Sequence, residues 1–200
     1  MKAKAKKTRI LTIIYLSLVL FIVTPIVCNA QDWSRKGKGE IFVFGQQMTG
    51  DTTTGLGIEL EVDDTTVGGF GMGANLNDHL NLNLDIFFGS TDVTAKGLGS
   101  TFKMDIDLYG MDLNLDYNIL KSRFTPMITG GIGYINFSGT VGGYEFDETD
   151  FSYNLGAGFR WDITDHFLIK GVYRVVWTEL EDSDGSIMLD GIGLSIGYLF

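Results

Sequence analysis

The sequence predicts an all-β protein, an eight-stranded antiparallel up-and-down barrel that spans a membrane. Three observations lead to this prediction. Polar and apolar residues alternate in successive segments, short polar turns alternate with long polar connections, and aromatic residues gather at both ends of the apolar faces. The chain has 27 glycines, 2 prolines and 12% aromatic residues, a composition unlike that of a disordered glycine-rich chain.

The first 30 residues differ in composition from the rest of the chain. Five basic residues precede an apolar run from Ile10 to Val27, and the small residue Ala30 stands before the polar Gln31. A basic start, an apolar centre and a small residue at the cleavage position predict a secretory signal peptide over residues 1–30. A retained membrane-anchoring helix is the alternative, and Pro25 disfavours it because proline breaks a helix.

The remaining chain is strongly acidic and contains no cysteine. Five of the 15 Lys and Arg residues lie before residue 10, which leaves ten against 25 acidic residues and a net charge of about −15. Nucleic acid is disfavoured as a partner, because phosphate contacts need clustered basic residues. With Cys28 the only cysteine, disulfides and thiol chemistry are excluded, and we expect no cofactor and no metal site. We expect residues 31–38 to form a short periplasmic segment and residues 39–200 to form the barrel domain.

Eight strands follow one another along this domain, and the first three differ in the clarity of their pattern. The segment from Gly39 to Gln47 is apolar on both faces, so the phase of the first strand stays open. Residues 66–76 alternate apolar residues with glycine, and residues 79–89 alternate most strictly. In that third strand the apolar face consists of Leu80, Leu82, Leu84, Ile86 and Phe88.

The five later strands repeat the pattern with the same chemistry on each face. They are expected at residues 109–117, 124–135, 151–163, 167–177 and 191–200. One face of each strand is apolar, and the other is polar and rich in glycine. The charged residues of the polar faces are Asp85, Asp112, Asp116, Arg160, Asp162, Lys170 and Arg174.

The alternation is interrupted just before the fourth strand. Apolar residues fall on even positions up to Leu108 and on odd positions from Tyr109 onward. Such a shift requires either a β-bulge or the membrane boundary near Leu108 to Gly110. We expect the strand before this point to extend beyond the bilayer as part of a loop, and Gly57 to Val62 to extend the first hairpin similarly.

Tight turns and long connections alternate regularly along the chain. The pairs Asn77-Asp78, Lys121-Ser122 and Thr164-Asp165 are tight polar turns at spacings of 43 and 44 residues. Longer polar segments connect the strands between these turns. Short turns at one end and long loops at the other predict a meander closed into a barrel.

The alternation alone does not say which face lies inside the barrel. A soluble barrel would place the apolar face inward, whereas a membrane barrel places it in lipid. The apolar faces carry no charge over about nine to eleven residues, the span that a tilted transmembrane strand needs. Aromatic residues at both ends of these faces form the pattern of two interfacial girdles, and glycine on the other face suits a narrow interior. The membrane interpretation is therefore preferred.

The last ten residues carry the most specific resemblance to a known group. The apolar residues of this ending are Ile192, Leu194, Ile196, Tyr198 and Phe200. This ending is similar to the signal by which the barrel-assembly machinery recognises its clients, and the chain resembles small outer-membrane barrels such as the OmpA transmembrane domain, OmpX and OmpW. The resemblance implies the outer membrane of a Gram-negative bacterium, both termini in the periplasm and loops at the cell surface.

The charged polar face admits two interpretations. Its acidic and basic residues could line a channel, or they could form ion pairs that plug the interior. We prefer the plug, because eight strands enclose a space that side chains fill and an unpaired buried charge is costly. The expected role is structural, adhesive or interactive through the loops. The alternative is an OmpW-like narrow channel for small hydrophobic molecules, which the polar and glycine-rich inner faces disfavour.

An enzyme that modifies lipopolysaccharide is a third interpretation. It needs a histidine near the loops, but the only two histidines, His79 and His166, fall in the short turns. We therefore expect no catalytic activity. Outer-membrane lipid and lipopolysaccharide are the expected partners of a monomeric barrel, and the partner of the loops is left open.

Overall fold

The computed structural model describes residues 33–50, 52–55, 58–97, 100–141, 144–179 and 186–200, so the expected signal peptide lies outside the described residues. Within these ranges no helix is long and apolar enough to cross a membrane. The strands are β1 (Gly39–Thr49), β2 (Thr52–Gly55), β3 (Ile58–Val62), β4 (Thr65–Asn75), β5 (Leu80–Gly97), β6 (Ser100–Asn118), β7 (Phe124–Val141), β8 (Tyr144–Asp162), β9 (Phe167–Glu179) and β10 (Ser186–Leu199).

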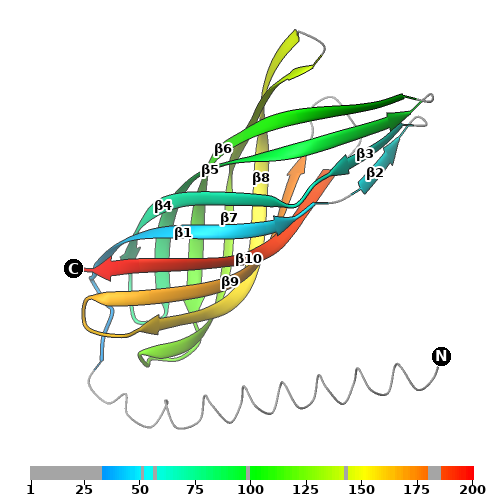
Figure 1. The fold of residues 1–200 in the computed structure, drawn as a ribbon. Coiled ribbons are helices and arrows are strands. Elements are labelled where there is room, and N and C mark those ends of the chain that lie inside the picture. Colours follow the sequence, from blue (N-terminus) through cyan, green and yellow to red (C-terminus); the bar gives the residue numbers. More distant parts are fainter. Residues whose placement is uncertain (1–32, 51, 56–57, 98–99, 142–143, 180–185) are drawn as a thin grey trace, which may run out of the picture.

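Eight of these strands close into a barrel (Figure 1). Around the ring the order is β1, β4, β5, β6, β7, β8, β9 and β10, and β10 pairs with β1 to complete it. Every pairing in the ring is antiparallel. The prediction of an eight-stranded antiparallel barrel is therefore confirmed, and each of these strands pairs with two neighbours within the ring.

The two ends of the barrel differ in their connections. We name the turn end for its three tight turns; the chain also enters β1 and stops at Phe200 there (Figure 1). The opposite end, the loop end, carries the longer connections. The strands β5 to β8 have 18 or 19 residues each, more than the nine to eleven needed to cross a bilayer. They project at the loop end (Figure 1).

The short strands β2 and β3 form a hairpin outside the ring. β3 pairs with β5 from Glu59 opposite Lys96 to Val62 opposite Val93. The expectation that this segment extends the first hairpin is therefore wrong in its pairing partner, and Gly57 lies outside the described residues. Because β4 stops pairing with β5 at Ser90, the rest of β5 has a free edge that β3 occupies.

Strand β6 passes the predicted irregularity without a bulge. Its pairing with β5 is continuous from Tyr117 to Ser100. The side chain of Leu108 is buried in the interior, whereas Tyr109 is exposed on the outer surface. Side chains of β6 continue to alternate between the two faces without interruption, and only the face that carries the apolar residues changes. The bulge interpretation is therefore wrong. A boundary near Leu108 fits this arrangement.

The structure also gives the phase of the first strand. Phe42, Gln46 and Met48 are buried, whereas Ile41 and Val43 are exposed on the outer surface. Glu40 is buried with the first set and meets cations of the interior. A buried charge needs partners, and here they lie only on the inner face.

The barrel is apolar outside and largely polar inside, as the alternation predicts. The apolar residues of the chain ending, which are Ile192, Leu194, Ile196, Tyr198 and Phe200, are all exposed on the outer surface. Phe200 exchanges two backbone hydrogen bonds with Gly39, of 2.9 and 3.0 Å, and its ring covers that glycine. A Cβ at Gly39 would lie 2.6 Å from the ring, so a larger residue there would displace the Phe200 side chain.

Candidate functional site

The inner side chains form three layers along the barrel axis. The inward residues of β9 run from Lys170 near the turn end through Arg174 to Val176 near the loop end. Those of β6 run likewise from Asp116 to Leu108. Charge therefore lies toward the turn end and apolar side chains toward the loop end. We name these layers the charged layer and the apolar chamber, and residues 33–38, which close the turn end, the stopper.

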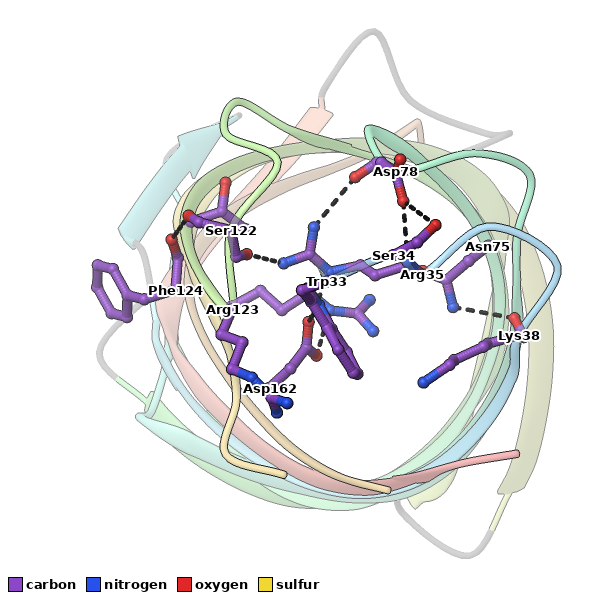
Figure 2. A network of polar contacts seen from close by, with 12 residues as sticks. Trp33, Ser34, Arg35, Lys38, Asn75, Asp78, Ser122, Arg123, Phe124 and Asp162 are labelled. Carbon is purple, nitrogen blue, oxygen red and sulfur yellow. Dashed lines mark hydrogen bonds and ion pairs between the residues drawn. The ribbon is translucent and has the colours of Figure 1, made fainter. Parts of the chain in front are cut away.

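The stopper is the segment that enters the barrel mouth ahead of β1 (Figure 2). A turn shapes it, in which the Lys38 amide donates to the Arg35 carbonyl at 2.9 Å and Gly37 adopts a φ of 80°. Side chains rarely adopt this conformation, so glycine suits the position. The Gly37 amide donates to the Asn75 carbonyl at 2.8 Å and ties the turn to β4.

Arg35 is the buried anchor of the stopper. Its Nε donates to Asp162 at 2.6 Å, one terminal nitrogen donates to the carbonyl of Asp78 at 3.1 Å, and the other donates to the carbonyl of Ser122 (Figure 2). The residue is fully buried. Three acceptors from three separate segments thus converge on one guanidinium, a geometry that the fixed fork of arginine favours.

Trp33 fills the centre of the mouth beside this anchor (Figure 2). Its indole nitrogen donates to Asp162 at 3.2 Å. The Lys38 ammonium lies 4.1 Å from the ring centroid and the Arg123 guanidinium lies 4.3 Å from it, on either side of the ring in Figure 2. Both distances are within the range of cation–π attraction. The stopper is therefore held by apolar burial and by charge together.

Asp78 holds the outer part of the stopper from the turn between β4 and β5. One carboxylate oxygen accepts from the Ser34 hydroxyl at 2.7 Å and from the Arg35 amide at 2.9 Å, and the other pairs with Lys121 at 2.7 Å. Burial alone would raise the pKa of Asp78, but these hydrogen bonds outweigh it and lower the pKa well below its ordinary value. Asp78 is therefore ionised at neutral pH.

The charged layer lies directly behind the stopper. Glu40 is at its centre, with one oxygen 2.5 Å from the Lys170 ammonium and the other 2.8 Å from Arg160. Arg160 also contacts Asp162 at 2.9 Å, and Lys170 contacts Asp116 at 3.1 Å. Each of these charges thus has a partner of opposite sign, which offsets the cost of burial.

A second, looser group lies toward the loop end of the charged layer. Arg174 lies 3.4 Å from Asp85 and 3.7 Å from Asp112. Asn114 donates to the same Asp85 oxygen at 2.8 Å. Arg174 and Asp112 also line the cavity of the apolar chamber, so they form its boundary toward the turn end.

Inward glycines make room for the polar side chains of neighbouring strands. A Cβ at Gly131 would lie 2.0 Å from the Asn114 side chain, and a Cβ at Gly133 would lie 2.1 Å from Asp112. The glycine-rich inner face thus has a steric reason, because larger residues would displace the side chains that pair the charges.

The apolar chamber occupies the loop half of the interior. Its buried residues are Met48, Val67, Leu108, Ile135, Val176 and Leu189, with Phe87, Ile106 and Phe137 packed against them. A cavity of about 30 Å³ remains among them above Arg174. The expectation of an interior too polar for an apolar cavity is therefore correct for the turn half and wrong for the loop half.

The structure places the predicted charged residues in two groups. Asp116, Arg160, Asp162 and Lys170 meet in the inner group, and Asp85, Asp112 and Arg174 meet in the outer group. Sequence reasoning missed three members of the interior. Glu40 could not be assigned to the inner face because the phase of the first strand was open. Trp33 and Arg35 lie before the first strand, where no alternation exists. The unequal count of four acids and three bases gave no signal for these residues, because adding Glu40 and Arg35 leaves the same excess of one acid.

The two histidines are structural parts of the tight turns. The Nδ1 of His79 donates to the Asn118 carbonyl at 2.8 Å, and that of His166 donates to the Leu199 carbonyl at 3.1 Å. Each ring also stacks on a tyrosine, Tyr117 or Tyr198. The described part of the chain contains no group of three or more His, Cys, Asp or Glu residues placed to hold a metal ion.

An antiparallel barrel with an apolar outer surface and paired charges inside is a transmembrane β-barrel. Residues 34–200 match the family model of the outer membrane protein beta-barrel domain. The chain therefore belongs to this family and is a protein of the Gram-negative outer membrane. No curated protein matches it in sequence.

Several solved structures share the fold at low sequence identity. Neisserial surface protein A (NspA) is 14% identical with a TM-score of 0.64, over 82% of this chain and 100% of that chain. OprG of Pseudomonas aeruginosa is 18% identical with a TM-score of 0.60, over 83% and 97%. The attachment invasion locus protein Ail of Yersinia pestis, in complex with the heparin analogue sucrose octasulfate, is 15% identical with a TM-score of 0.52, over 82% and 99%.

Proposed function

We propose that this protein is a closed barrel that acts at the cell surface through its loops and conducts no solute along its axis. The stopper and the charged layer behind it support the proposal. The cavity beside Lys170 measures about 30 Å³, which holds about two water molecules. An ion would have to separate several buried pairs to pass this layer.

We infer that the turn end, with both termini, faces the periplasm. Outer-membrane barrels have short periplasmic turns and longer extracellular loops. The ending with Phe200 on the lipid-facing surface fits recognition by the barrel-assembly machinery. A single closed ring fits a monomer.

The charge of the loop end favours partners that tolerate or bridge negative charge. The segments 50–65, 90–108, 136–150 and 178–190 hold 17 acidic residues against Lys96 and Lys103. A polysulfated ligand such as the heparin analogue bound to Ail would be repelled there. Cationic partners, or lipopolysaccharide bridged by divalent cations, fit this surface.

Planar-bilayer recording tests the closed barrel. The purified protein should give no large, stable conductance, and neither should an Arg35→Gln variant, because the charged layer remains behind the stopper. A large and stable open pore in the unmodified protein would contradict the proposal.

The apolar chamber favours a second candidate function, the binding of a small hydrophobic molecule from the outer side. Its side chains would have to move apart for this, because the cavity among them measures only about 30 Å³. An apolar pocket above a polar floor is the usual form of a small-molecule site. A small apolar fluorophore titrated into the protein in nanodiscs should bind, and Val176→Asp should abolish binding while Ile132→Asn on the outer surface should not. Equal binding by the Val176→Asp variant would show that the fluorophore sits elsewhere.

We also propose that the protein is not an enzyme. Both histidines already bond backbone carbonyls at the turn end, far from the loops. Mass spectrometry of lipid A from cells with and without the gene tests this directly. A mass difference that depends on the gene would contradict it.

A further inference from the structure

The part of β8 that projects at the loop end has a neighbouring strand on one side only. β8 pairs with β7 continuously from Tyr144 to Trp161. Its pairing with β9 on the other side begins only at Ser152, which lies opposite Thr178. Within the described residues, therefore, no strand pairs with residues 144–151 on the side away from β7, and we name this side the open edge. The hairpin that carries it projects at the top of Figure 1.

Three residues of the open edge direct their backbone groups away from β7. The Thr178 hydroxyl donates to the Phe151 carbonyl at 3.3 Å, so the backbone groups of Phe151 face the β9 side. Backbone groups point to alternate sides along a strand, so those of Thr149, Asp147 and Glu145 face the same way as those of Phe151. Each of these three residues therefore presents an N–H donor and a carbonyl acceptor to the open edge.

Two side chains beside these backbone groups are turned away from the open edge. The Asn136 amide donates to the Asp147 carboxylate at 2.5 Å and to the Thr149 hydroxyl at 2.9 Å. Asn136 belongs to β7, on the opposite side of β8 from the open edge. Lysine, proline and bulges commonly protect sheet edges from pairing, and residues 144–151 contain no lysine, no proline and no break in register. The backbone groups are therefore accessible to an added strand.

The charge of the open edge favours a basic partner. Residues 144–151 include four acidic residues and no basic residue. The side chains of Glu145, Asp147 and Glu148 are exposed. Side chains on paired strands lie about 5 Å apart, where opposite charges attract and like charges repel. An added strand that carries lysine or arginine would therefore bind more favourably than an acidic one.

We propose that the open edge of β8 binds an extended segment of another protein, rich in lysine or arginine, as an additional antiparallel strand. Backbone hydrogen bonds to Glu145, Asp147 and Thr149 hold the segment, and its basic side chains pair with the acidic side chains of β8. The inference rests on the proposed role at the cell surface, and it names the surface and the kind of partner for that role.

A second copy of this chain fits the open edge poorly. Pairing of two such edges about a two-fold axis would bring the acidic side chains of one copy against those of the other. Like charges directly opposite each other destabilise a sheet. A basic segment replaces this repulsion with attraction.

Fluorescence anisotropy with two peptides tests the proposal. The protein in nanodiscs is titrated with a fluorescein-labelled peptide of alternating lysine and threonine. The control peptide has the same side chains and charge, but every backbone nitrogen is methylated, so it has no N–H group to donate. We expect the first peptide to bind and the methylated peptide to bind at least about tenfold more weakly, because it cannot complete the ladder of hydrogen bonds.

Substitutions at Thr149 test the same contact from the protein side. Thr149→Pro removes one N–H group from the open edge, whereas Thr149→Ala retains it, and both remove the hydroxyl without a change in charge. We expect Thr149→Pro to weaken binding of the first peptide about tenfold and Thr149→Ala to weaken it less than about twofold. Bound peptide should also slow hydrogen exchange at the amides of Glu145, Asp147 and Thr149, measured by NMR.

Several results would overturn strand addition. They are equal binding of the two peptides, no binding of either, equal binding by the Thr149→Pro and Thr149→Ala variants, or dimers of the protein that form through this edge. Equal binding of the two peptides would still agree with an acidic surface that attracts cations. Planar-bilayer recording tests the closed barrel independently of all these outcomes.

Discussion

In the turn half of the interior, Glu40 contacts Arg160 and Lys170 directly, whereas in the loop half Val67, Leu108 and Val176 belong to a cluster of buried apolar side chains. The first half is held by directional contacts between charges and the second by apolar packing. Removing one charge leaves its partners buried and unpaired, whereas trimming an apolar side chain leaves a cavity. The two halves should therefore respond differently to substitution.

The largest effect is expected at the centre of the charged layer. Glu40→Ala should lower the free energy of unfolding by about 3–5 kcal/mol, because it leaves two buried cations without their shared partner. Urea unfolding of the protein in lipid bilayers measures this. Asp165→Asn at the exposed rim is the control and should change stability by less than about 1 kcal/mol. A similar small loss for Glu40→Ala would show that water enters the layer freely.

A smaller effect is expected in the apolar chamber. Leu108→Ala should cost about 2–3 kcal/mol, because it removes buried methyl groups beside an existing cavity. Leu108→Met should cost less than about 1.5 kcal/mol in the same assay, because it conserves volume. If both substitutions cost equally, packing would not be what stabilises this half.

Substitution of the stopper anchor should change the free energy of unfolding less than the two substitutions above. Arg35→Gln breaks the ion pair with Asp162, but the segment can leave the mouth and water can reach the carboxylate. We expect a loss of about 1–2 kcal/mol and stronger acrylamide quenching of Trp33, measured with Trp161 and Trp177 replaced by Phe. Unchanged quenching would mean that the stopper stays in the mouth without this ion pair.

The smallest effect is a pH dependence of the stopper. The pKa of Asp78 is lowered in the folded protein, so its stabilisation is fully present above the unfolded-state pKa of about 4 and is lost as the pH falls further. Quenching of Trp33 should stay constant from pH 7 to about pH 4 and rise below that. Asp78→Asn should remove this rise, and a rise between pH 7 and pH 5 would point to a different group.

The outer surface could be predicted from the sequence, because lipid imposes a strict period of two on every strand that it touches. Leu80 to Phe88 illustrates this, since each second residue meets the bilayer. The chamber was not predicted, because Leu108 and its neighbours lie where apolar residues move to the inner face and the period offers two explanations. The phase of β1 was not predicted either, because Phe42 and Phe44 are apolar residues on its inner face.

The stopper was beyond prediction for a different reason. Trp33 and Arg35 belong to no strand, and their partners Asp78, Ser122 and Asp162 come from three distant parts of the chain. The local periodicity of the sequence carries no information about contacts between distant segments. Only the closed ring, which brings the three turns together, makes them neighbours.

Two backbone hydrogen bonds hold Gly39 beside Phe200, so the start of the first ring strand and the residue after the last one are neighbours. Joining these two residues and opening the chain in the connection between β7 and β8 would preserve every strand pairing, since termini that lie together allow circular permutation. Such a permuted protein would keep the ring and lose the stopper, which exists only because the chain enters the barrel ahead of Gly39. Circular permutation therefore separates the barrel from the segment that closes its mouth.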